Sequence, residues 1–277
     1  MSETLSQCLR RLAREALQEP DPALKSQMVI DLHTRPVAHI DPLAVYPEPS
    51  LLPGRPTQPT IVAPQHVPQR GLGTVEGRAG LVHALAHIEF NAINLALDII
   101  WRYPNLPESF YGGWLTVAYE EVVHFNLLRQ HLLQLGYDYG SFPAHDGLWD
   151  MAERTKEDLL ARLALVPRTL EARGLDACPI VRNKLAKAGD QAAAEILDII
   201  LRDEVGHVAL GNYWYRRLAA EFKHDPLTEY PQLAIQYRAP RLRGPFNIPA
   251  RLKAGFTPAE LDWLQDQDKA KAKSENA

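Results

Sequence analysis

Four long stretches in the middle of the chain repeat apolar residues every three or four positions, the spacing that places them on one face of an α-helix. In the first stretch the pattern is formed by Leu81, Leu85, Ile88, Leu95 and Ile99. The four predicted helices run from Thr74 to Tyr103, from Pro107 to Leu135, from Leu148 to Ala188 and from Asp190 to Glu221. Helices of this length predict an all-α fold built on an antiparallel four-helix bundle.

Residue types at the helix ends support these boundaries. Thr74 and Asp190 are good N-caps, and Gly136 is suited to end the second helix. The third helix contains Gly174 and Pro179, either of which can end it early. We expect it instead to be kinked around Pro179 and to continue from there.

The segments outside the bundle differ in composition. After a short helix near Leu5 to Gln18, prolines crowd residues 20–71 and exclude long helices there. Scattered apolar residues favour an extended arm packed on the bundle over a disordered tail. We therefore expect a helix and Pro-rich arm (1–72), the bundle (73–222) and a C-terminal extension (223–277) with a basic segment and a short helix capped by Thr257.

Composition and charge narrow the classes of partner. Of 277 residues, 46% are apolar and 23% are charged, which is ordinary for a globular protein. A net charge of −4 gives no general attraction to nucleic acid or anionic lipid. The basic segment 238–253 contains no Asp or Glu, so a local contact with nucleic acid stays open.

The small number of cysteines and the lack of a long apolar segment exclude several classes of protein. Two cysteines are too few for a zinc ribbon or a Cys-ligated iron–sulfur cluster. The sequence also shows neither a signal-peptide pattern nor an uninterrupted apolar span of ~20 residues. We expect a cytoplasmic protein without a membrane partner.

The second and fourth predicted helices carry the same motif, an acidic residue followed by Glu-Val-x-His. It reads Glu120-Glu121-Val122-Val123-His124 in one helix and Asp203-Glu204-Val205-Gly206-His207 in the other. A Glu and a His three positions apart lie on one helix face, so each pair can bind a metal. One such pair arises readily by chance, but two of them, 83 residues apart in corresponding helices, indicate a metal site.

Carboxylate-bridged two-metal bundles also take one Glu from each of the other two helices. Glu89 and Glu121 each lie 16 residues from Asn105, in the loop between their helices, so they meet at the same height. Glu171 and Glu204 meet in the same way if the second turn lies near Gly189. The predicted metal ligands are Glu89, Glu121, His124, Glu171, Glu204 and His207. His83 and His87 face away from Glu89 and are expected in the core or on the surface.

Charge and ligand chemistry indicate which metals fit. Four glutamates and two divalent ions form a neutral cluster that can be buried. Oxygen and nitrogen ligands without a thiolate suit iron or manganese better than structural zinc. We expect two divalent metal ions, with iron favoured and manganese as the alternative.

Several longer motifs resemble those of one known family. They include His83-Ala84-Leu85-Ala86-His87-Ile88-Glu89, Leu165-Val166-Pro167-Arg168-Thr169-Leu170-Glu171 and Leu201-Arg202-Asp203-Glu204-Val205-Gly206-His207, with Arg243-Gly244-Pro245-Phe246-Asn247 in the tail. The chain resembles the ferritin-like family catalogued as domain of unknown function 455. The resemblance covers most of the chain and implies a ferritin-like bundle, distantly similar to rubrerythrins and to the di-iron hydroxylase that modifies transfer RNA. It implies no substrate.

The predicted metal cluster favours a di-iron or manganese–iron oxidoreductase, of the oxygenase or oxidase type, that activates O2 or peroxide. Its substrate would be a small molecule or a nucleotide. Electrons would come from an external donor, because two cysteines cannot build a rubredoxin. Two alternatives stay open: ferroxidase or peroxidase activity, and a metal-stabilised binding module without redox turnover. The arm and tail favour a monomer or dimer over an iron-storage cage.

Overall fold

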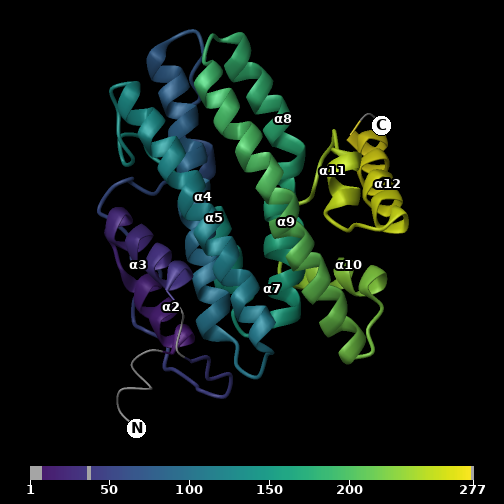
Figure 1. The fold of residues 1–277 in the computed structure, drawn as a ribbon. Helices are drawn as coiled ribbons and strands as arrows, with labels where there is room; N and C mark the ends of the chain where they lie inside the picture. Colours follow the sequence, from purple (N-terminus) through teal and green to yellow (C-terminus); the bar gives the residue numbers. More distant parts are fainter. Residues whose placement is uncertain (1–7, 36–38, 276–277) are drawn as a thin grey trace. The chain divides into compact units, whose positions relative to one another are not determined.

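The computed structural model describes residues 8–35 and 39–275, and over these ranges the chain is all-α, as predicted (Figure 1). Strand-like pairing in the described residues is limited to two isolated bridges, Cys8 with His39 and Ile61 with Ala144. The chain separates into two compact units, the first ending at Trp149 and the second beginning at Asp150. None of the described helices combines the length and apolar character needed to cross a membrane.

A long helical hairpin forms the centre of the first unit. Helices α4 (Val75–Arg102) and α5 (Glu108–Gln134) are packed along their length. Thr74 caps α4 as predicted, because its hydroxyl accepts the Gly77 N–H at 3.0 Å. Gly136, with a φ of 86°, follows α5 in the left-handed conformation that ends a helix.

Two shorter helices flank this hairpin (Figure 1). Helix α2 (Leu9–Gln18) packs on α4, and α3 (Pro22–Thr34) packs on α5. The extended arm expected from residue 20 therefore begins only after α3. Asp21 caps this helix by accepting the Ala23 N–H at 2.8 Å, and Pro22 fits its first turn. The crowding of prolines farther along the arm masked this start signal in the sequence.

The rest of the arm (39–74), which includes the one-turn 3₁₀ helix η1 (Pro64–His66), is attached to helices of its own unit. The Gly54 N–H donates to the Leu17 carbonyl at 2.8 Å. The buried guanidinium of Arg10 donates both to Pro42 in the arm, at 3.3 Å, and to Trp101 at the end of α4, at 2.8 Å. These bonds join α2, the arm and the end of α4.

The second unit contains another hairpin, formed by α8 (Ala172–Lys187) and α9 (Gln191–Glu221). Asp190 caps α9 as predicted and accepts the Ala193 N–H at 3.1 Å. The third predicted helix is broken into α6 (Gly147–Arg154), α7 (Leu159–Leu165), the π-helical turn η2 (Val166–Glu171) and α8.

The interruptions of this helix differ from the expected kink at Pro179, because α8 continues through that proline. Asp158 starts α7 by accepting the Ala161 N–H at 2.9 Å, which separates α7 from α6. The π-helical turn lies around Pro167, which has no N–H and whose ring clashes with the preceding turn of a regular α-helix. Pro167 approaches α9 closely at Gly211, where an added Cβ would lie 2.6 Å from the proline Cβ.

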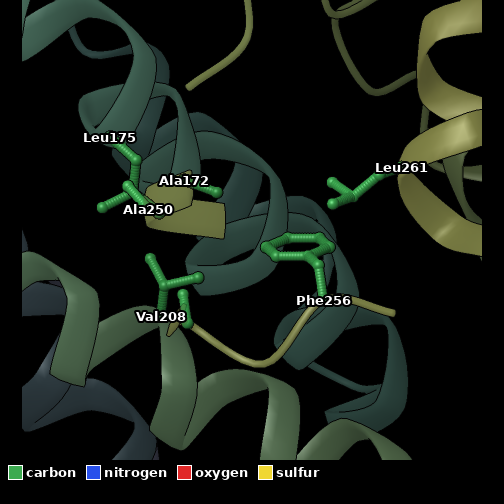
Figure 2. Close-up of a cluster of buried hydrophobic side chains, with 7 residues drawn as sticks. Ala172, Leu175, Val208, Ala250, Phe256 and Leu261 are labelled. Atoms are coloured by element: carbon green, nitrogen blue, oxygen red, sulfur yellow. The ribbon is translucent and has the colours of Figure 1, made fainter. Parts of the chain in front are cut away.

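The C-terminal part comprises α10 (Pro226–Gln236), α11 (Ile248–Lys253) and α12 (Pro258–Glu275). Thr257 and Glu260 form the predicted capping box at the start of α12, which is longer than the short helix expected. An apolar cluster attaches this part to the α8–α9 hairpin (Figure 2). The cluster contains Ala172, Leu175, Val208, Ala250, Ala254, Phe256 and Leu261.

The two hairpins correspond to the first and second pairs of predicted helices. Their assembly into one four-helix bundle stays a prediction, as does the division of the chain at residues 72 and 222.

Candidate metal centre

Glu121 and His124 lie on α5 of the first unit, and both side chains are fully buried. The His124 Nδ1 lies 3.5 Å from the Glu121 Oε2, as expected for residues three apart on one helix face. The Glu-x-x-His spacing therefore produces a carboxylate and an imidazole side by side.

Glu89 reaches the same place from α4. Its Oε2 lies 3.2 Å from the His124 Nδ1, and the ligand atoms of Glu89, Glu121 and His124 all lie within 4.8 Å of one another. The equal distances of Glu89 and Glu121 from the α4–α5 turn account for this meeting. Three of the six predicted ligands thus form a buried cluster that can hold a metal ion.

The close approach of these buried groups shifts their pKa values. Burial, together with the nearby Glu121 charge, raises the pKa of Glu89 well above its ordinary value. Burial alone would lower the pKa of His124, but hydrogen bonds and charges from both glutamates outweigh it and raise the pKa to about 11. A proton on His124 therefore offsets part of the negative charge, a role that a metal ion can fill with two oxygens and one nitrogen as ligands.

The second motif has the same local geometry in the second unit. Glu204 and His207 lie on α9, both buried, with the His207 Nδ1 3.4 Å from the Glu204 Oε1. Glu171 is the last residue of η2, is half-buried, and belongs to an element that packs on α9. The union of all six residues in one centre stays a prediction.

His83 and His87 make other contacts, as their position on α4 predicts. The His83 Nε2 accepts the Gly140 N–H at 2.9 Å. The His87 Nε2 lies 3.1 Å from the His145 carbonyl oxygen, and its Nδ1 lies 2.8 Å from the Tyr139 hydroxyl oxygen. Both histidines are buried and hold the loop after α5 against α4.

Comparison with known proteins agrees with the resemblance noted in the sequence. The family described as "Protein of unknown function (DUF455)" matches residues 18–262. An "Uncharacterized protein" of Haemophilus influenzae is 46% identical over 263 residues, which cover 91% of this chain and 91% of the relative. No solved structure matches the chain.

Proposed function

The chain belongs to the DUF455 family, and we propose that it is a dinuclear metal-carboxylate protein, an oxidoreductase that activates O2 or peroxide. The observation that carries the proposal is the buried cluster of Glu89, Glu121 and His124, whose ligand atoms lie within 4.8 Å of one another. This donor set provides half of the ligands that a two-metal carboxylate bundle requires.

The other half would come from Glu171, Glu204 and His207. The two Glu-x-x-His pairs have nearly the same separation between carboxylate and imidazole, 3.5 Å in α5 and 3.4 Å in α9. Glu171 lies 82 residues after Glu89, close to the 83-residue offset of the paired motifs. This repetition supports a centre to which each hairpin contributes two glutamates and one histidine.

Four glutamates would balance two divalent ions, and the burial of Glu89, Glu121 and Glu204 would limit the access of bulk water to the centre. Iron, or manganese in its place, would when bound supply the electrons that reduce O2 or peroxide. The protein's residues would hold the ions and accept protons as the charge of the centre changes. Cys8 and Cys178 are both buried free thiols, so we propose an external electron donor and a small-molecule or nucleotide substrate.

Metal content tests the proposal. We expect about two iron or manganese atoms per chain in wild-type protein after anaerobic reconstitution, and a strong loss in the double variant Glu121→Gln, Glu204→Gln. The matched control, Glu108→Gln with Glu195→Gln, changes exposed glutamates on the same two helices and should retain the metal. Absence of metal from reconstituted wild-type protein would refute the proposal.

The redox part has its own test. Iron-loaded protein prepared without oxygen should consume O2 on exposure to air and gain absorption in the near ultraviolet. Bound iron that remains unchanged in air would favour the alternative of a metal-stabilised binding module. Rapid oxidation of iron that is then released would favour ferroxidase activity.

A further inference from the structure

A cleft in the second unit lies among η2, α10, α11 and α12. Its volume reaches about 350 Å³ only when space open to solvent is included, so a ligand there would remain partly in solvent. We name it the arginine cleft; its floor and walls include Arg168, Leu227, Tyr230, Leu242, Arg251 and Trp263.

Arg168 extends from η2 into the cleft lining and is only 4% exposed. Its Nη1 donates to the Asn212 Oδ1 at 2.6 Å and its Nη2 to the Glu260 Oε1 at 2.7 Å. The guanidinium stacks near Tyr215 and Phe256, 4.9 and 4.8 Å from the ring centroids. Its Nε is buried and has no hydrogen-bond partner among the described residues.

Arg251, from α11, is a second fully buried guanidinium in the same lining. Its Nε and Nη2 bind both oxygens of Asp176, at 3.0 and 2.6 Å, and Nη2 also donates to the Ala172 carbonyl at 3.2 Å. Its Nη1 is buried and finds no hydrogen-bond partner in the part of the chain that the structure describes. Two arginines at one cleft thus each retain one unused donor.

The charges of this network do not balance. Glu260 is shared, since its second oxygen accepts from Arg216 at 2.9 Å, so three guanidinium groups face two carboxylates. Burial alone would raise the pKa of the Glu260 carboxyl, but the neighbouring arginines hold it below its ordinary value. Arg216 is about one-third exposed, so the excess positive charge lies at the solvated edge of the network, and one bound anion would neutralise it.

The remaining walls are apolar or aromatic. Leu227 and Tyr230 from α10 and Trp263 from α12 line the cleft and are half-buried. Tyr230 and Trp263 meet edge to face, with ring centroids 5.6 Å apart. A ligand with only a charged group would leave these surfaces without a partner.

We propose that the arginine cleft binds a small organic anion, whose carboxylate or phosphate group is received by the free donors of Arg168 and Arg251 and whose apolar or aromatic body packs on Tyr230 and Trp263. Guanidinium groups recognise both kinds of anion with paired donors. None of the six predicted metal ligands lines this cleft, and its test uses metal-free protein.

Isothermal titration calorimetry of the full chain tests the site with four probes: benzoate, phenyl phosphate, inorganic phosphate and the neutral analogue benzamide. We expect saturable binding of one benzoate or phenyl phosphate per chain, at least about tenfold tighter than benzamide and inorganic phosphate. The preferred aromatic anion identifies the charged group as carboxylate or phosphate.

Two variants connect the binding to the cleft. Leu227→Trp fills it without removing a charge and should weaken binding about tenfold or more, whereas Ile235→Trp, exposed on the same helix, should stay within about twofold of wild type. Arg168→Lys should also weaken binding, while Arg162→Lys, at another buried arginine, should not. The proposal would be overturned if neither benzoate nor phenyl phosphate bound saturably, or if Leu227→Trp left their binding unchanged. The arginines would then serve only to pack the aromatic rings.

Discussion

Replacement of Gly211 by alanine should destabilise the second unit, because η2 lies directly against this residue. An added Cβ would lie 2.6 and 2.8 Å from the Cβ and Cγ of Pro167, about 1 Å closer than carbon atoms pack. Neither the proline ring nor the helix backbone can rotate away from this contact. Overpacking of this kind costs about 1–3 kcal/mol.

Gly206 provides a matched control on the same helix. No atom lies within 4 Å of the Cβ that alanine would add there, so Gly206→Ala should stabilise α9 by up to about 1 kcal/mol, the ordinary preference for alanine in a helix. The same preference offsets part of the clash at Gly211. We therefore expect Gly211→Ala to lose up to about 2 kcal/mol net, and the two variants to differ by about 1–3 kcal/mol.

Urea unfolding followed by circular dichroism measures this difference. It is made on metal-free protein, because Gly206 lies between Glu204 and His207. Equal unfolding free energies for the two variants would refute the close packing of Pro167 on α9, and with it the explanation of the π-helical turn.

Three further predictions concern the first unit. Burial lowers the pKa of His83 to about 4, so the unfolded chain takes up the proton more readily, and the free energy of unfolding should be highest above pH ~6.5 and fall by at most about 3 kcal/mol toward pH ~4. Urea unfolding should therefore show a smaller loss of stability between pH 7 and pH 5 for His83→Gln than for wild type. An equal loss in the two proteins would contradict the lowered pKa of His83. Arg10→Met should cost about 3 kcal/mol or more in the same assay, because it leaves buried carbonyls of Ile100 and Trp101 without a donor, whereas Arg11→Met, which breaks one exposed pair with Glu15, should cost under about 0.5 kcal/mol. Metal binding should release protons, because the pKa of His124 is raised in the metal-free cluster. Calorimetry in buffers of different ionisation enthalpy should show this release as a binding heat that depends on the buffer. A binding heat that is the same in every buffer would contradict it.

Much of the fold followed from local signals that act over a few residues. Thr74, Asp190 and Gly136 mark helix ends through their own side-chain or backbone chemistry, and each was found where the sequence placed it. The meeting of Glu89 with Glu121 and His124 was also predictable. In a regular helical hairpin, residues that are equally many positions from the turn lie at the same level along the two helices.

The interruptions of the third helix were harder to predict because they depend on tertiary contacts. Pro167 is tolerated within a helical segment where Gly211 of another helix lets it approach. Pro179, by contrast, interrupts α8 less than expected. Nothing in the local sequence indicates which of these two prolines interrupts its helix more strongly.

Buried positive charges were also missed, because isolated basic residues are normally solvated. Lys25 is fully buried, and this burial lowers its pKa to about 7. Its Nζ donates to the Leu17 and Gly54 carbonyls, at 3.3 and 3.0 Å, and to the Asn94 side chain. These partners come from three distant segments, so no spacing rule connects them. Arg168 and Arg251 were missed for the same reason.

We propose that the six predicted ligands form one dinuclear centre. X-ray absorption spectroscopy of iron-loaded protein tests it most directly, because it measures the distance between neighbouring metal ions. The account predicts two irons per chain with an iron–iron distance of about 3.5–4 Å. Two irons per chain without such a neighbour would mean that each hairpin binds its own ion, and would contradict the account.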